Sequence, residues 1–311
     1  MNYASLDDFL TRGRAALAKG PVALIFAEDL AEIASTLAHH RKAGFREIVA
    51  FCPPGFALPE AEAESTHCVA YATLAEGAVP TAVNAVIAAA PETTWLYYCY
   101  NAEYLFHPFC ETRNVREMIA FHAEERRDAI LTYVIDLYAE DLGTFPDAVD
   151  RDSAMLDRSG HYALARKDAA KNFEPKERQL DFYGGLRWRF EEHIAWTRRK
   201  IDRISVFRAQ KGLKLLDGHV FNIEEYNTYA CPWHHNLTVA IASFRTAKAL
   251  RTNPGSMYAV SIFSSRSRLC NMLSVKRSML NTTSSPFDRA HSRIFVASSR
   301  FFEKIVEAMP N

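Results

Sequence analysis

The chain has 311 residues, 49% hydrophobic and 24% charged, which suits one large soluble α/β domain or two ordinary ones with a full core. Its formal net charge of zero is unevenly placed, because the part from Arg245 onward carries a surplus of eight positive charges and the first 244 residues an equal negative surplus. No apolar run of about eighteen residues exists to cross a membrane, and six scattered cysteines without a C-x-x-C pair indicate a reducing cytoplasm without disulfides or a zinc site.

The N-terminal stretch MNYASLDDFLTRGRAALAKG predicts an amphipathic helix and does not resemble a signal peptide. From there onward, predicted strands alternate with predicted helices. We expect strands at 22–26, 46–52, 67–72, 95–100 and 129–141, and helices at 30–44, 79–91 and 112–128. The alternation, the continuous apolar strands and the short connections predict an α/β fold whose mixed, mostly parallel sheet is covered by helices on both faces.

After residue 150 the sequence becomes polar, and 157–190 predicts a loop-rich insertion facing the substrate, followed by a helical or mixed tail from about Ser243. The basic C-terminal part has two interpretations. It contacts a nucleotide, an acidic glycan or an anionic membrane surface, which would place a cytoplasmic protein at the inner membrane face, or it packs on the acidic remainder of the chain.

Polar residues follow several of the predicted strands, where ligands bind in sheets of this class. Glu103, after the aromatic strand WLYYCY, is either a ligand for a divalent metal or sugar hydroxyl, or a polar residue where a strand leaves the core. Glu28 and Asp29 end the first strand, and Asp29 either caps the next helix or contacts a base or ribose, roles that are compatible. Asp136 lies toward the end of the strong strand predicted at 129–141.

Histidines at three places in the chain are candidate ligands. His39 and His40 point about 100° apart on a helix, which favours helix packing over shared metal binding. His234 and His235, in YACPWHHNL, lie in a loop that could supply a metal or phosphate ligand. His219 follows a turn and is a candidate for a cleft.

The most unusual segment is FYGGLRWRF. Gly184 and Gly185 permit positive φ angles or a close backbone approach to a ligand. Arg187 and Arg189, if they alternate along a strand, place two guanidinium groups on one face, where they suit a diphosphate. The alternative is a glycine turn before an exposed basic strand.

Six blocks, in order, resemble a branch of the family 2 glycosyltransferases. The blocks are ALIFAEDLAEIASTLAHHRKAGFREIVAF, WLYYCYNAEYLF, AILTYVIDLYAEDL, FYGGLRWRF, ISVFRAQKGLKLLDGH and VAIASFRTAKAL. The resemblance implies a GT-A (Rossmann-like) domain over 1–250, with its core from about residue 20, and a basic extension over 251–311 that packs on it. It also implies a nucleoside-diphosphate-sugar donor, a glycan or related acceptor, no nucleic acid, and usually Mn²⁺ or Mg²⁺.

The metal motif departs from the family pattern. In the preferred register, Tyr100 and Ala102 stand where the family has two aspartates; slipping by one residue puts Asn101 and Glu103 there. The helix-start histidine falls at Ser243, with His234 or His235 as a substitute. The expected function is therefore sugar transfer, and the alternative is an inactive nucleotide-sugar or glycan-binding relative.

The resemblance assigns the candidate residues to three roles. The catalytic candidates are Glu103 and Asp136, and the metal candidates are Glu103 and His235. The donor-binding candidates are Glu28, Asp29, Gly184, Gly185, Arg187, Arg189 and His219. The donor sugar, the acceptor, the stereochemical outcome and the oligomeric state do not follow from the sequence.

Overall fold

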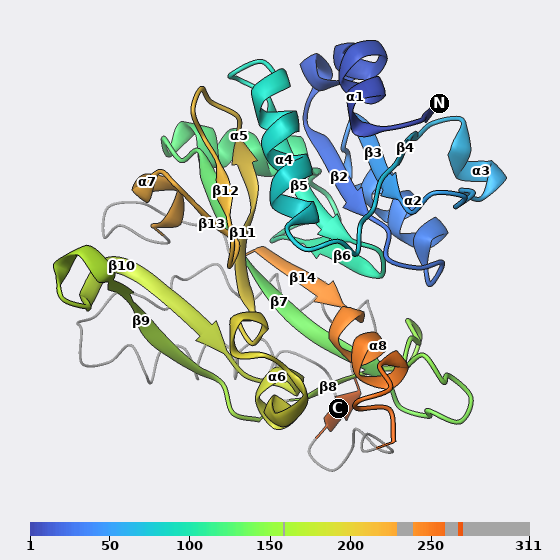
Figure 1. Cartoon of the computed structure of the whole chain (residues 1–311), viewed down its shortest axis with the longest axis vertical. Coiled ribbons are helices and arrows are strands. Elements are labelled where there is room, and N and C mark those ends of the chain that lie inside the picture. The colour runs from blue at the N-terminus through green and yellow to red at the C-terminus, as the bar shows by residue number, and fades with distance from the viewer. Residues whose placement is uncertain (158, 229–238, 259–266, 270–311) are drawn as a thin grey trace. The chain divides into compact units, whose positions relative to one another are not determined.

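A computed structural model describes residues 1–157, 159–228, 239–258 and 267–269. It has the predicted α/β fold, a mixed and mostly parallel sheet flanked by helices (Figure 1). Within these described residues, no helix has both the length and the apolar character needed to span a membrane.

The chain divides into two compact units. Unit 1 comprises 1–104, 113–131 and 204–227, and unit 2 comprises 105–112, 132–203 and the residues from 228 onward. At three of its five crossings, after residues 104, 131 and 203, the chain passes between the units inside a strand, so this division does not follow a single linker in the sequence. The predicted extension over 251–311 lies mostly outside the described residues, and its packing and membrane contact stay predictions.

Unit 1 contains a sheet whose strand order is β1-β4-β3-β2-β5-β11. The bounds are β1 Asn2–Tyr3, β2 Val22–Phe26, β3 Glu47–Cys52, β4 His67–Ala70, β5 Trp95–Tyr100 and β11 Asp202–Arg208. The first five strands are parallel and β11 is antiparallel to β5. Val22 lies opposite both Glu47 and Leu96, so β2, β3 and β5 end at the same edge of the sheet.

Two helices cover opposite faces of this sheet. Helix α2 (Ile33–Ala43) places His40 against Tyr97, whereas α4 (Ala78–Ala89) packs in the core that contains Tyr98, the next residue of β5. Neighbouring residues of a strand point to opposite faces, which explains the separation. The remaining helices of unit 1 are α1 Leu6–Asp8, which continues as a π-helical turn and a 3-10 turn to Lys19, α3 Glu60–Ala63, α5 Val115–Glu124 and α7 Glu224–Asn227.

Helix α2 begins three residues later than predicted. The Asp29 carboxylate accepts a hydrogen bond from the Ala31 N–H at 2.9 Å, and Glu32 has φ 54°, so the chain turns before the helix starts. Asp29 thus holds this turn and does not cap α2. The helix ends at Gly44, as predicted, in a left-handed conformation with φ 102° that glycine adopts readily.

Unit 2 is built around β7 (Ala129–Ala139), which pairs in parallel with β14 (Val239–Ser243) and antiparallel with β8 (Ala154–Asp157). Its other elements include β6 Glu103–Phe106 beside β14, β15 Ser267–Leu269 beside β8, α6 Leu186–Arg189 and α8 Arg245–Thr252. Leu186 of α6 packs with Ala247 and Leu250 of α8 and with Tyr138 of β7 in one apolar cluster.

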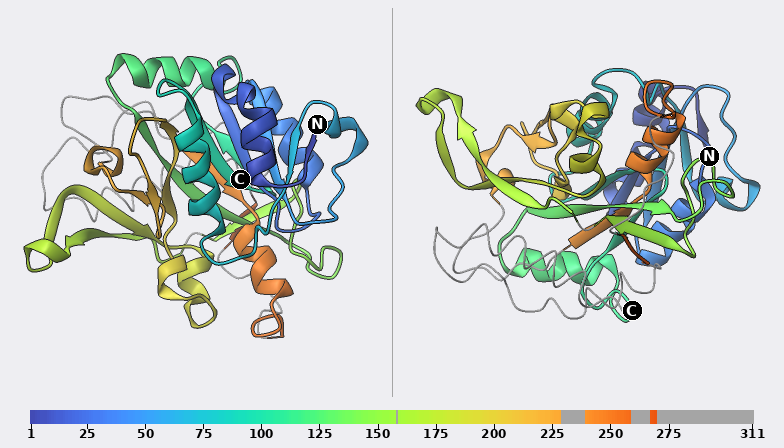
Figure 2. Two further views of the ribbon diagram at one scale, coloured as in Figure 1. Left: turned by 45° about the horizontal axis from the view of Figure 1, so that its top comes forward. Right: turned by 90° about the horizontal axis from the view of Figure 1, so that it is seen from below.

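The region predicted as a polar loop is largely a hairpin. Strands β9 (Tyr162–Asp168) and β10 (Glu174–Tyr183) form a long two-stranded antiparallel ribbon, visible in Figure 2. Its many charged and only partly buried side chains concealed the strands from pattern analysis. The register shifts between Pro175 and Leu180, and Arg178 has φ 56°, so β10 bulges there.

Candidate functional site

Asn101 joins two strand ends of unit 1. Its Oδ1 accepts the Glu28 N–H at 2.9 Å, and its Nδ2 donates to Asp29 Oδ1 at 2.7 Å and to the Ala31 carbonyl at 2.9 Å. The residue is completely buried just after β5. The structure therefore brings the predicted residues Glu28 and Asp29 together with the aromatic strand block, through the Asn101 amide.

Glu103 holds the tight turn between β5 and β6. Its Oε2 accepts the Tyr100 N–H at 2.9 Å, and the side chain is buried with the residue 1% exposed. Ala102, between them, has φ 58° and donates its N–H to Thr36 Oγ1 at 2.9 Å. Two roles were left open for Glu103. The contact seen in the structure is that of a polar residue that supports the backbone where a strand leaves the core.

The residues at the expected metal position do not fit Mn²⁺ or Mg²⁺, which need several oxygen ligands. Ala102 offers no side-chain ligand, Asn101 uses its amide to link strand ends, and Glu103 accepts a backbone N–H. Across the described parts of the chain, no group of three or more His, Cys, Asp or Glu side chains is arranged to hold a metal ion. His234 and His235 lie outside the described residues.

His40 is a core residue, in line with the packing interpretation. Its Nδ1 lies 2.8 Å from the Thr36 carbonyl, and its ring stacks on Tyr97 with centroids 5.2 Å apart. Burial, with a smaller contribution from the nearby His39, lowers the pKa of His40 to about 3. The imidazole is therefore neutral at physiological pH.

His219 lies in the turn between β12 (Leu215–Leu216) and β13 (Val220–Phe221), where Gly218 and His219 both have positive φ. Its Nδ1 is 3.0 Å from the buried Tyr98 hydroxyl, and the two rings are nearly parallel, with 19° between their planes. His219 is thus tied to the aromatic strand of unit 1.

Asp136 is the centre of a polar cluster in unit 2. Arg187 makes a bidentate ion pair with it, Nε to Oδ2 at 2.7 Å and Nη2 to Oδ1 at 3.0 Å, and Thr246 Oγ1 adds a hydrogen bond at 2.8 Å. The exposed fractions of the Arg187 and Asp136 side chains are only 13% and 3%. Ser243 lies opposite Asp136 in the β7–β14 register, which brings the start of α8 to this carboxylate.

The arginines of FYGGLRWRF do not alternate along a strand. Gly184 and Gly185 have φ 147° and 61°, and these angles turn the chain into α6, a single helical turn. Arg187 pairs with Asp136, whereas Arg189 pairs at 2.7 Å with the buried Asp157. The expectation of two guanidinium groups on one strand face is therefore wrong, because each cation meets its own carboxylate.

The glycine pair also makes room for a neighbouring ring. A Cβ atom on Gly184 would lie 2.3 Å from the His161 Cδ2 atom, which is far inside van der Waals contact. The backbone at Gly184 thus lies close to the side chain of His161.

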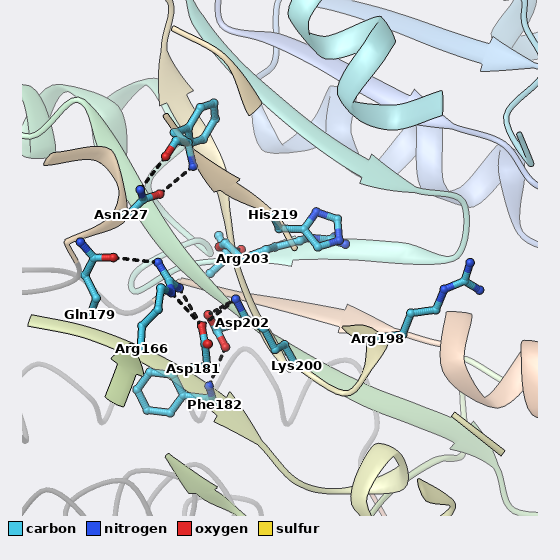
Figure 3. Close-up of polar contacts among 12 residues, drawn as sticks. Arg166, Gln179, Asp181, Phe182, Arg198, Lys200, Asp202, Arg203, His219 and Asn227 are labelled. Atoms are coloured by element: carbon cyan, nitrogen blue, oxygen red, sulfur yellow. Dashed lines mark hydrogen bonds and ion pairs between the residues drawn. The ribbon is translucent and has the colours of Figure 1, made fainter. Parts of the chain in front are cut away.

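A further charge cluster in unit 2 has no counterpart among the sequence predictions. Arg166 and Lys200 both reach Asp181 Oδ1 at 2.7 Å, and Lys200 Nζ is 3.8 Å from Asp202 Oδ2. Figure 3 shows these four side chains pointing toward one another while the Phe182 ring points away. The four residues come from β9, β10 and the segment that leads into β11. No local sequence motif therefore predicts the cluster.

Burial acts differently on the two carboxylates of this cluster. It raises the pKa of Asp202, which is 3% exposed, although Lys200 and the Phe182 N–H partly oppose the shift. Burial also acts to raise the pKa of Asp181, but the charges of Lys200 and Arg166 outweigh it and leave that pKa lowered.

Arg198 is a further residue that the sequence analysis did not single out. Its carbonyl oxygen accepts a hydrogen bond from Arg187 Nη1 at 3.5 Å, whereas its own side chain is exposed. No carboxylate among the described residues forms an ion pair with the Arg198 guanidinium, which Figure 3 shows extended away from the charge cluster. The basic run Arg198-Arg199-Lys200 was the available sequence signal.

Comparison with models of known families gave no match for this sequence. A comparison with curated proteins likewise found no similar chain.

Proposed function

We propose that the protein is a glycosyltransferase that moves a sugar from a nucleoside-diphosphate donor to a glycan or related acceptor. The observation that carries the proposal is that three separate blocks of the family resemblance meet at one carboxylate. Asp136, Arg187 and Thr246 belong to AILTYVIDLYAEDL, FYGGLRWRF and VAIASFRTAKAL, and they are joined by hydrogen bonds of 2.7–3.0 Å. A chance likeness of short motifs gives no reason for such contacts.

The blocks in unit 1 support the same conclusion. Asn101, from the aromatic strand block, contacts the opening block at Glu28, Asp29 and Ala31. Tyr98, from the same strand, contacts His219 of the block ending LLDGH. Each of these pairs joins residues far apart in sequence, and Glu28, Asp29 and His219 are among the residues that the resemblance assigns to donor binding.

Breaking the bond between a sugar and a diphosphate leaves negative charge on the phosphate, which cationic groups must stabilise. Arg187 and Arg189 are already paired with aspartates, so in this proposal they position the local backbone. The exposed Arg198, whose carbonyl is bonded to Arg187, is the cation in this region that we assign to the departing diphosphate. Asp136 is a positioning residue, because its bidentate ion pair fixes the Arg187 side chain.

The proposal is tested by incubating the protein with a panel of uridine, guanosine and cytidine diphosphate sugars, with Mn²⁺ and with EDTA. We expect donor hydrolysis or transfer with at least one sugar, and calorimetric binding of the matching nucleoside diphosphate. Arg198→Glu should weaken that binding by about tenfold or more, since it reverses a charge facing an anion. Arg113→Glu, on the surface beside α5 in unit 1, is the matched control. Absence of binding and turnover with every donor would refute the proposal.

A second candidate is a binding protein that uses the same scaffold without catalysis. The specific observation favouring it is that Tyr100 and Ala102 replace the aspartates of the metal strand while Glu103 holds the backbone of the adjacent turn. Nucleoside-diphosphate binding that Mn²⁺ leaves unchanged, with no hydrolysis or transfer, would support this candidate over the enzyme.

A further inference from the structure

Three aromatic rings form a column across one end of the β9–β10 ribbon in unit 2. Tyr162 and Tyr183 lie opposite each other in the register and stack with centroids 5.1 Å apart and 15° between planes. Trp196 stacks on Tyr183 at 5.0 Å and 20°. Parallel rings at this spacing form a rigid surface, because each ring restricts the tilt of the next.

The last ring of the column is open to solvent. Trp196 is 53% exposed even though Tyr183 lies on it and the Arg199 guanidinium carbon is 5.6 Å from its centroid. Arg199 is itself fixed by Glu191, 2.8 Å from its Nη1, and by two carbonyl groups. Trp196 therefore presents an exposed ring whose orientation is fixed by its contacts with Tyr183 and Arg199.

A row of charged side chains runs beside the column on the same face of the strands. Asp181 is two residues before Tyr183 in β10, and successive side chains of a strand alternate between faces, so both point the same way. Tyr183 pairs with Lys200 across the neighbouring segment, which adds Lys200 to this face. Charged groups therefore flank the aromatic surface.

Asp181 retains a free hydrogen-bond acceptor. Arg166 Nε, Arg166 Nη2 and Lys200 Nζ all contact its Oδ1, at 3.1, 2.7 and 2.7 Å. No donor among the described residues contacts Oδ2, and the side chain is 19% exposed. The pair of cations keeps this carboxylate ionised and fixed in orientation, which suits it to accept hydrogen bonds from a ligand.

We propose that this face is a carbohydrate subsite, in which a neutral pyranose ring stacks on Trp196 and donates hydroxyl hydrogen bonds to Asp181. The C–H groups on one face of a pyranose carry partial positive charge and complement the negative face of an indole. Its hydroxyl groups complement a carboxylate. The adjacent cluster contains two cations and two carboxylates, so it does not present a surface of one sign. As an acceptor subsite, this inference rests on the proposed function.

The test uses the full chain and four neutral hexasaccharides as probes: cellohexaose, maltohexaose, mannohexaose and chitohexaose. We expect at least one to bind in calorimetry at millimolar concentration. Trp196→Ala should weaken that binding on the order of tenfold, and Trp196→Phe, which retains a ring, should weaken it less. Asp181→Asn should also weaken binding, because an amide accepts less strongly than a carboxylate.

Trp188 provides a matched control in the same segment. It is 43% exposed, but it lies against Gly160 and no other ring in the described structure stacks on it. Trp188→Ala should change saccharide binding by less than about twofold. Circular dichroism and thermal unfolding of each variant verify that the fold is retained.

Two results would overturn the inference: no hexasaccharide binds the wild type, or Trp196→Ala binds the probe as tightly as wild type does. Loss of nucleotide binding instead of saccharide binding in Trp196→Ala would also overturn it, in favour of base stacking. The failure of the subsite is distinguishable from the failure of the proposed function. Donor hydrolysis without saccharide binding removes only the subsite, whereas saccharide binding at Trp196 without any donor binding removes only the transferase.

Discussion

The two units stabilise the polar residues at or near their strand ends by different means. In unit 1, Asn101 and Glu103 are bonded mainly to backbone N–H and carbonyl groups of adjoining turns. In unit 2, Asp136 and Asp157 are bonded to arginines of the short helix α6. Hydrogen bonds, mostly to the backbone, hold the first arrangement, and buried ion pairs hold the second.

Substitutions at polar positions that look alike in the sequence should therefore lower the stability of the protein by different amounts. A lost backbone hydrogen bond leaves a dipole unsatisfied, whereas a lost ion-pair partner leaves a full charge in a poorly solvated place. Substitutions at the ion pairs of unit 2 should consequently be more damaging than those at the strand ends of unit 1.

The largest effect is expected for Arg187→Met. The substitution preserves most of the side-chain volume but leaves Asp136, whose side chain is 3% exposed, without its cation. We expect the free energy of unfolding to fall by about 3–5 kcal/mol in urea denaturation. Adding Asp136→Asn in the same chain should recover part of the loss, because the isolated charge is then removed.

The control for this prediction is Arg113→Met, which breaks the pair between Arg113 and Glu117 of α5. The two side chains are 64% and 41% exposed, so the change should stay within about 0.5 kcal/mol. If Arg187→Met proved as mild as this control, the difference drawn between the units would be wrong.

Asn101→Ala tests the arrangement of unit 1 and should have the next largest effect. It deprives the Glu28 N–H and the Asp29 and Ala31 carbonyls of one shared partner. We expect a loss of about 2–4 kcal/mol, measured in the same urea experiment. Asn101→Asp should also destabilise, since it retains the acceptor for Glu28 but places a second carboxylate against Asp29. Wild-type stability in either variant would contradict the role given to this amide.

The sequence predicted the strands and main helices of unit 1 well, because their cause is local. The segment Val22–Phe26 is a completely buried apolar strand. Gly44 ends α2 in a left-handed backbone conformation, which favours glycine. The β9–β10 hairpin was not predicted because its strands, rich in charged residues, lack the regular alternation that reveals a half-buried strand.

The candidate site was predicted only in part, since its contacts join residues far apart in sequence. The sequence singled out both Asp136 and the FYGGLRWRF segment, but it did not indicate that the carboxylate and Arg187 form an ion pair. Local patterns could not separate a strand from the single helical turn of α6. The positive φ angles at Gly184 and Gly185 decide between them.

His40 provides a pH-dependent test of the buried face of unit 1. Its pKa is about 3 in the folded protein and near 6.5 when exposed, so the unfolded state binds an additional proton between these values. This part of the stability is complete above pH 6.5 and is lost as the pH falls toward 3. The slope reaches about 1.4 kcal/mol per pH unit.

Comparison with His40→Leu isolates this contribution, because the other titrating groups are shared. As the pH is lowered from about 7 to about 5, wild type should lose stability relative to the variant in urea denaturation. A difference between the two proteins that stays constant over this range would show that His40 does not titrate as its burial requires.

Glu103→Gln should have the smallest effect, although it replaces the residue that the sequence placed first among the catalytic candidates. The amide oxygen that this substitution introduces still accepts the Tyr100 N–H, so we expect a loss below about 1 kcal/mol. Glu103→Ala, which removes the acceptor, should cost roughly 1–3 kcal/mol. Donor hydrolysis, measured beside stability, separates backbone support from catalysis: support alone predicts that E103Q keeps its turnover, whereas a general base at this position predicts its loss in a stably folded protein.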